Sequence, residues 1–181
     1  YTVIYQDIQD ALAEILETTK DQHVFAIGLG MVEDLCGFFY VGCTLEQLEN
    51  FEDVHELWWI SEWEYSSTAN NRVHGAIHAL YEQLGDDCTE EQYAELRQSY
   101  QNTIIQVLQN LRAENKLKNQ QGEEMIYIIQ YADAFDEEFE DVSFAQINPE
   151  EYVPLFANRF KQKKGANLYD FLLQKYQALQ R

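Results

Sequence analysis

The chain is poor in the residues that break regular structure or cross-link a small fold. Its 181 residues include only two prolines, eight glycines and three cysteines. The scarcity of proline and glycine leaves few positions at which the backbone must break. An odd number of cysteines without Cys-x-x-Cys spacing disfavours both a disulfide framework and a zinc framework. Cys36 and Cys43 lie in an apolar stretch, where we expect buried, unreactive thiols.

Long apolar runs are absent as well. No run is long enough to span a bilayer, and no basic segment followed by an apolar one opens the sequence. Together with the unpatterned cysteines, these absences predict a cytoplasmic protein with no membrane partner. The apolar fraction of 46% and the aromatic fraction of 14% predict a folded globule despite the high charge. At this length we expect one globular domain that spans residues 1–181.

Positive charge is scarce over most of the chain. Residues 1–158 hold 31 of the 32 carboxylates and six of the 12 lysines and arginines, a net charge of −25. Residues 159–181 hold the other six basic residues against Asp170 alone, a net charge of +5. An acidic body repels nucleic acid and attracts basic partners, so we expect a basic protein partner and no nucleic acid. That inference weakens if Lys161, Lys163 and Lys164 fold back onto the acidic body.

The spacing of apolar residues predicts the element order α-β-β-α-α-α-β-(β)-α-α. This order is typical of an α+β fold, with a small, mainly antiparallel sheet of about three to five strands packed by several helices, including a long helical hairpin. The main expected elements are a first helix that ends near Lys20, a β-hairpin from His23–Gly30 and Cys36–Cys43, helices at Asn71–Leu84 and after Thr89, a central strand in Glu124–Tyr131, a further strand at Val142–Ile147 and a last helix at Leu168–Leu179.

Helix boundaries are marked by cap residues. Thr44 with Gln47 and Thr89 with Gln92 have the spacing of capping boxes, and Gly85 is placed to end the helix before it. In the helix Asn71–Leu84 we expect one face to point inward, formed by Val73, Ile77, Leu80, Tyr81 and Leu84. Asn148 and Pro149 open another helix, which restarts at Pro154 because a proline inside a helix loses a hydrogen bond.

Motifs for catalysis, metals or cofactors are weak. His74 and His78 are four residues apart on a predicted helix and could face one metal ion, but Gly75 stands where a metalloprotease helix has glutamate. Gly28-Leu29-Gly30 follows a strand but lacks the third glycine and the helix of a dinucleotide site, so glycines of a hairpin explain it better. We therefore expect no cofactor and no metal, and assign no catalytic residue.

The densest acidic run is Asp133–Asp141, which we expect to be a loop. It lacks the ligand order of a calcium-binding loop. Because it combines carboxylates with two phenylalanines, it could steer and hold a basic partner, and a solvated loop with both rings in the core is the alternative. The candidate binding residues are Phe135, Asp136, Glu137, Glu138, Phe139, Glu140 and Asp141.

Three tryptophans within six residues form the most specific local string. Trp58, Trp59 and Trp63, with Glu62 between them, could form a recognition surface, because tryptophan is enriched in binding hot spots. The alternative is that they close one end of the core and that Glu62 accepts an indole N–H, which is the more common role of large aromatic residues.

A few aromatic and polar marks resemble a bacterial family of unknown function. They are Phe25-Ala26-Ile27, Gly37-Phe38-Phe39-Tyr40, Trp59-x-x-Glu62-Trp63, and Ile126–Tyr131 leading to Asn148-Pro149. Over nearly the whole chain this pattern is similar to the domain of unknown function DUF4303. The resemblance implies an uncharacterised cytoplasmic bacterial protein, and some members resemble immunity proteins of polymorphic toxin systems. It brings no catalytic residue to this sequence.

Four functional hypotheses follow. The first is a non-enzymatic acidic protein-binding module of the immunity-protein type, which occludes a basic partner. The second is an acidic mimic of nucleic acid that inhibits a nucleic-acid-binding protein. The third is an enzyme whose site is assembled from dispersed residues, namely His55, Glu62, His74, His78 and Cys88. The fourth is an acidic protein whose charge serves solubility alone.

Overall fold

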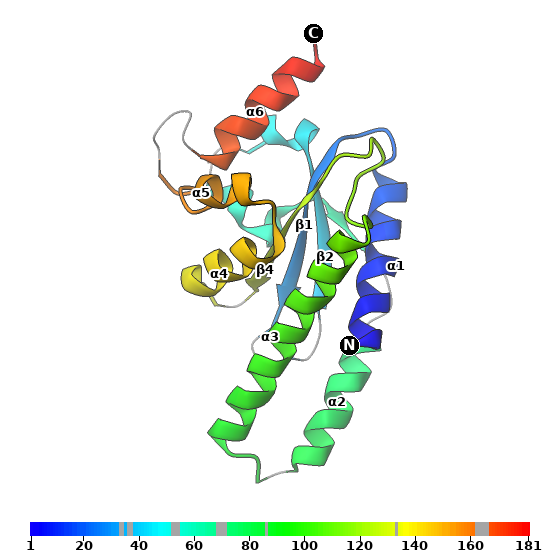
Figure 1. Ribbon diagram of the computed structural model, residues 1–181, viewed down its shortest axis with the longest axis vertical. Helices are drawn as coiled ribbons and strands as arrows, with labels where there is room; N and C mark the ends of the chain where they lie inside the picture. The colour runs from blue at the N-terminus through cyan, green and yellow to red at the C-terminus, as the bar shows by residue number, and fades with distance from the viewer. Residues whose placement is uncertain are drawn as a thin grey trace.

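The computed structural model describes residues 1–32, 35, 38–51, 55–67, 72–85, 87–132, 134–161 and 167–181. Figure 1 shows a sheet with helices on both sides and a helical hairpin that projects beyond it. The elements are α1 (Thr2–Thr18), β1 (Val24–Met31), β2 (Phe38–Thr44), η1 (Leu45–Glu49), η2 (Glu56–Trp58), η3 (Ile60–Glu62), β3 (Tyr65–Ser66), α2 (Arg72–Leu84), α3 (Glu90–Ala113), β4 (Ile126–Tyr131), α4 (Glu137–Ile147), η4 (Glu150–Tyr152), α5 (Val153–Phe156) and α6 (Leu168–Leu179), where η marks a short 3-10 helix.

The four described strands form one mixed sheet in the order β3-β2-β1-β4. β1 and β2 are the predicted antiparallel hairpin, in which Gly30 lies opposite Phe39. β4 pairs with the other side of β1 in parallel, so Met31 and Tyr131 end the two strands side by side. The α+β class is confirmed, and one of the three strand pairs is parallel.

Each face of the sheet carries its own core. On one face α1, α2 and α3 cover Leu29 and Tyr127, and on the other η1–η3, α4, α5 and α6 cover Val41 and Ile128. Every residue of β1 and β4 is therefore buried. This explains why both strands are apolar at successive positions instead of alternating with polar residues.

The helical hairpin is α2 followed by α3. Gly85, with a φ of 75°, ends α2 as predicted, and its N–H donates to the Tyr81 carbonyl at 3.1 Å. Both hydrogen bonds of the Thr89–Gln92 capping box are formed. The two helices run antiparallel beside each other (Figure 1). Leu80 is 40% exposed, so the prediction that it faces inward is wrong.

The start of α2 is anchored by a buried carboxylate of α1. Asp7 is 1% exposed and accepts hydrogen bonds from the Val73 N–H at 3.1 Å and from Arg72 at 3.2 Å. A carboxylate at the N-terminus of a helix accepts hydrogen bonds from the free N–H groups there and interacts favourably with the positive end of the helix dipole. Arg72 also donates to Asp10, which lowers the pKa of that exposed carboxyl.

β4 lies at the edge of the described sheet, so the prediction of a central strand is wrong. Its apolar sequence reflects burial on both faces, since helices cover each side. The side chain of Asn148 takes the place of a neighbouring strand. It accepts from the Tyr127 N–H at 2.7 Å and donates to the Tyr127 carbonyl at 2.8 Å. An edge that would otherwise present free backbone groups is thereby partly satisfied.

Most of the acidic run and the strand predicted after it form one helix. Residues Glu137–Ile147 form α4, so the strand prediction for Val142–Ile147 is wrong, and the loop prediction holds only for the described residues 134–136. Asp136 is the N-cap, and its carboxylate accepts from the Phe139 N–H at 3.0 Å. Three glutamates in the first turn favour a helix start through the dipole. Asp133 lies outside the described residues.

Parts of the basic segment do fold onto the acidic body. Arg159 pairs with Glu140 and Asp141, and Lys175 of α6 lies 2.8 Å from Glu123. Asn148 is not the predicted N-cap but follows α4, whereas α5 begins next to Pro154 as expected. Lys161 donates to Asn158 at 2.8 Å. Cys36, Lys163 and Lys164 lie outside the described residues.

Candidate functional site

The three tryptophans separate into two core residues and one surface residue. Trp58 is 1% exposed and Trp63 is 4% exposed, whereas Trp59 is 55% exposed. Trp63 donates its indole N–H to the Leu57 carbonyl at 2.8 Å, so Glu62 is not its acceptor. The three tryptophans separate because Trp59 is the single residue between η2 and η3. Its backbone is extended there, whereas Trp58 ends η2 and Trp63 follows η3. Trp59 is therefore the member of this string that a partner can reach.

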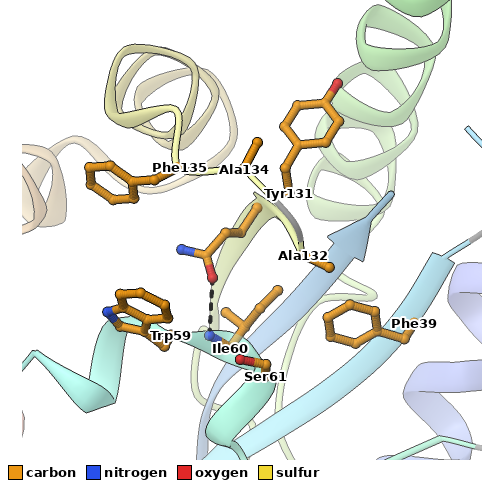
Figure 2. Close-up of a pocket in the computed structure, with 9 residues that line it drawn as sticks. Phe39, Trp59, Ile60, Ser61, Tyr131, Ala132, Ala134 and Phe135 are labelled. Carbon is orange, nitrogen blue, oxygen red and sulfur yellow. Dashed lines mark hydrogen bonds between the residues drawn. The ribbon is translucent and has the colours of Figure 1, made fainter. Parts of the chain in front are cut away.

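A pocket of about 220 Å³ lies beside Trp59, at the carboxyl ends of the parallel strands β1 and β4. Open sheets with parallel strands often bind ligands at this position. Figure 2 shows Trp59 and Phe135 along one side of the pocket and Phe39 on the other. The remaining lining residues are Ile60, Ser61, Gln130, Tyr131, Ala132 and Ala134.

The two glycines of β1 allow side chains to lie directly on the strand. A Cβ atom added to Gly28 would lie 2.9 Å from Ile60, and one added to Gly30 would lie 1.8 Å from the Phe39 ring. Both neighbours line the pocket, so these glycines shape its base. The pair of glycines that resembles a nucleotide-binding turn thus has a packing role, as the hairpin interpretation predicted.

We expect Gly30→Ala to lower the free energy of unfolding by about 1–3 kcal/mol, because the Phe39 ring must move to admit the methyl group. Gly75→Ala is the matched control. Gly75 lies in α2 with nothing within 4 Å of an added Cβ, so alanine there should raise stability by up to about 1 kcal/mol. Urea denaturation of both variants measures the difference, and equal effects would contradict this account of the pocket base.

Gln130 holds the backbone on both sides of Trp59. Its Oε1 accepts from the Ile60 N–H at 3.2 Å, the bond drawn in Figure 2, and its Nε2 donates to the Trp58 carbonyl at 3.0 Å. The same Nε2 donates to Glu140 at 3.0 Å. One buried carboxamide therefore fixes the turn from which Trp59 projects, and a rigid support of this kind lowers the entropy cost of binding.

Glu140 and Arg159 extend this network as an ion pair sealed from solvent. Their side chains are 1% and 0% exposed, and Nη2 lies 3.1 Å from Oε2. Burial raises the pKa of Glu140, against the opposing effects of Gln130 and of the Arg159 charge. The guanidinium lies between the rings of Phe156 and Phe160, at 4.1 and 4.7 Å from their centroids. Such a pair holds its surroundings in place only while both charges are present.

The aromatic surface continues beyond the pocket. Phe135 is 59% exposed and meets the edge of Phe160 at 5.8 Å, and the His55 ring stacks on Phe160 at 5.5 Å. A second hollow is lined by His55, Trp59, Phe135, Phe160 and Glu137, and a third by His55, Trp59, Glu56 and Glu62. We call the five rings the aromatic patch: Phe39, His55, Trp59, Phe135 and Phe160. Trp59 lines all three hollows.

Carboxylates flank the aromatic patch on two sides. Glu137 lines one adjoining hollow, and Glu56 and Glu62 line the other. No lysine or arginine occurs among the described residues that line these hollows. The patch therefore combines apolar faces with an acidic border.

Of the predicted acidic binding run, Phe135 belongs to the aromatic patch and Glu137 borders it. Asp136 caps α4, and Phe139 packs its ring 5.6 Å from that of Tyr131. Glu138 faces a separate hollow that Arg97 also lines. Glu140 and Asp141 pair with Arg159 inside the chain.

The dispersed residues of the predicted enzyme site do not converge. His55 and Glu62 line one hollow beside Trp59. His74 and His78 lie on α2, which packs on the opposite face of the sheet, and Cys88 lies in the turn after α2. His78 is near Glu82, at 3.6 Å, with both side chains exposed. Among the residues that the structure describes, no group of three His, Cys, Asp or Glu side chains could hold a metal ion.

Cys43 behaves as predicted from its apolar surroundings. It is fully buried, and burial raises the pKa of its thiol well above the ordinary value. A thiol in that environment stays protonated and unreactive.

Sequence reasoning missed several residues of the site, namely Phe39, Ser61, Gln130 and Phe160. The register of the hairpin contained one usable signal. Gly30 lies opposite Phe39, and a glycine opposite an aromatic residue indicates a ring lying across the strand. No local signal marks Gln130 or Phe160, because their partners are distant in the sequence.

Comparison of the chain with protein-family models, with curated proteins and with solved structures gave no match. The resemblance to the DUF4303 family therefore stays a prediction from the sequence. None of the described helices has both the length and the apolar character needed to cross a membrane.

Proposed function

We propose that this protein is a non-enzymatic protein-binding module that occludes a basic partner through the aromatic patch. The observation that carries the proposal is the pairing of two exposed aromatic side chains, Trp59 and Phe135, over a common pocket with carboxylates on either side. Exposed large aromatic residues that share one hollow are typical of binding hot spots. The surrounding negative charge would speed the approach of a basic protein.

The size of the pocket favours a side-chain anchor over a small-molecule substrate. Its volume of about 220 Å³ is below the roughly 300–1,000 Å³ of small-molecule sites, and the adjoining hollows of about 400 and 380 Å³ are more open to solvent than the pocket. Two hydroxyls line the pocket, those of Ser61 and Tyr131, and the Tyr131 hydroxyl accepts hydrogen bonds from Arg97 at 2.9 Å and Gln101 at 2.7 Å. No histidine or carboxylate is among its described lining residues, so none of them places a base beside either hydroxyl. This chemistry supports recognition.

The immunity type is the form of this function that we propose. In it, one copy of the acidic protein covers the working surface of one copy of a basic toxin. The supporting features are the net charge of −20 and the sequence resemblance described above. The corresponding experiment is co-expression with the product of the neighbouring gene, followed by measurement of a one-to-one complex and of lost toxin activity.

The proposal is tested by affinity capture from the source cell with immobilised protein, at low and high salt. We expect a basic protein to be retained at low salt and released at high salt. Trp59→Ala combined with Phe135→Ala should weaken binding of that protein by roughly thirtyfold, the effect of losing a hot spot of about 2 kcal/mol.

The control is a variant in which exposed apolar residues outside the patch are removed, Leu80→Ala with Val142→Ala. It should retain the partner as the unaltered protein does. No retained protein at low salt, or equal loss with both double variants, would overturn the proposal.

A further inference from the structure

We infer that the pocket beside Trp59 takes an arginine side chain of the partner, with its guanidinium against the aromatic faces and its charge toward Glu62 and Glu137. This inference rests on the proposed function and adds the chemistry of the anchor. An arginine fits for two reasons. The pocket has aromatic rings on two sides. Among the described residues of the two adjoining hollows, the ionisable ones are His55 and the carboxylates Glu56, Glu62 and Glu137.

The walls of the pocket suit a flat, weakly hydrated cation. Phe39 lies across the pocket from Trp59 and Phe135 (Figure 2), so a planar group in the pocket meets an aromatic side chain on either side. A guanidinium stacks on such rings and loses little hydration, whereas an ammonium is compact and strongly hydrated. The apolar floor at Ile60 and Ala132 accommodates the methylene groups of the same side chain.

An arginine of the chain itself, Arg159, makes the same two kinds of contact next to the aromatic patch, with aromatic rings and with carboxylates. The guanidinium of Arg159 lies against two phenylalanine rings and pairs with Glu140 and Asp141. One of those rings, Phe160, also contacts Phe135 and His55 of the aromatic patch. The pocket beside Trp59 offers the same ingredients, aromatic faces and nearby carboxylates, but none of its described lining residues supplies a cation.

The carboxylates lie in the two hollows that adjoin the pocket on either side of Trp59, and none is among the described residues that line the pocket itself. Glu62 shares one hollow with Trp59, and Glu137 shares the other with Trp59 and Phe135. Both glutamates are exposed. They can therefore pair with a cation that arrives from solvent without any rearrangement of the fold. The buried carboxylate of Glu140, in contrast, is not accessible to such a cation.

The test uses the full chain labelled with 5-fluorotryptophan and two short peptides of equal charge, one alternating arginine with glycine and the other lysine with glycine. Fluorine NMR gives a separate signal for each of the three tryptophans. We expect the arginine peptide to shift the Trp59 signal and to leave the buried Trp58 and Trp63 signals nearly unchanged. The arginine peptide should bind about threefold tighter than the lysine peptide, the size of an exposed cation–π contact.

Three variants separate the contributions. Trp59→Leu, read out on a fluorophore attached to the peptide, should lower the affinity for the arginine peptide to that for the lysine peptide. Glu62→Gln with Glu137→Gln should weaken both peptides and reduce the salt dependence of binding. Glu91→Gln, on the exposed first turn of α3, is the control that should change neither.

Equal affinity for the two peptides or an unshifted Trp59 signal would overturn the inference. These outcomes differ from failure of the proposed function. If a protein partner depends on Trp59 but the arginine peptide does not displace it, the anchor is wrong and the binding function stands.

Discussion

Arg159→Met is expected to lower the free energy of unfolding by about 3–5 kcal/mol. The substitution leaves the Glu140 carboxylate buried without its partner, in a site where both side chains are at most 1% exposed. It also removes the contact with Asp141 and the stacking on Phe156 and Phe160. Urea denaturation followed by tryptophan fluorescence measures the loss.

The pH dependence of this variant follows from Glu140. Burial already raises the pKa of Glu140 above its ordinary value of 4.5, and removal of Arg159 raises that pKa further. A carboxyl with a raised folded-state pKa favours the folded protein below its unfolded pKa, and that contribution is lost as pH rises through the folded pKa. The deficit of Arg159→Met should therefore be larger at about pH 8 than at about pH 5.

Two comparisons make the Arg159 prediction specific. Adding Glu140→Gln to Arg159→Met should recover part of the lost stability and remove the added pH dependence, because no buried charge then lacks a partner. Lys161→Met, at an exposed position two residues away, should change stability by less than about 0.5 kcal/mol. If Arg159→Met and Lys161→Met behave alike, the buried ion pair does not hold this part of the fold.

Trp58→Ala should lower the free energy of unfolding by about 3–5 kcal/mol, whereas Trp59→Ala should change it by less than about 0.5 kcal/mol. Trp58 is 1% exposed and packs edge-on against Phe156, so its removal leaves a cavity. Its indole N–H has no hydrogen-bond partner among the described atoms, so the loss comes from packing alone. Trp59 is 55% exposed and leaves no cavity.

Each of these two variants is the control for the other, because both make the same Trp→Ala change at adjacent positions and differ only in the burial of the indole. Thermal and urea denaturation should rank Trp58→Ala far below Trp59→Ala in stability. Partner binding should rank them in the opposite sense at a temperature where both are folded. A large loss of stability in Trp59→Ala would show that Trp59 belongs to the core and would remove the basis of the proposed function.

The sequence predicted elements best where local chemistry and apolar spacing agreed. The last helix, Leu168–Leu179, has the predicted bounds, and Asn167 caps it by accepting from the Asp170 N–H. The β-hairpin, the Thr89 capping box and the end of α2 at Gly85 were also predicted. In each case the decisive interaction joins residues close in the sequence or follows from a regular period.

The prediction failed where a local signal was overlooked or the decisive partner was distant. In the acidic run Asp133–Asp141 the local helix signal was present, since Asp136 caps α4 and three glutamates follow it, and the distant part is Arg159, which pairs with Glu140 and Asp141. β4 has the composition of a central strand, but its open edge is satisfied by the Asn148 side chain, 21 residues away from Tyr127. Composition cannot show such partners.

The sequence alone determined the α+β class, the acidic body and the presence of an unusual tryptophan string. Tertiary structure alone decided which tryptophan reaches solvent, because the answer depends on two short turns held by Gln130 from another part of the chain. It also decided which acidic residues remain available, since Arg159 uses Glu140 and Asp141 and leaves Glu137 beside the aromatic patch. Charge and hydrophobicity are properties of residues, whereas exposure is a property of the packed chain.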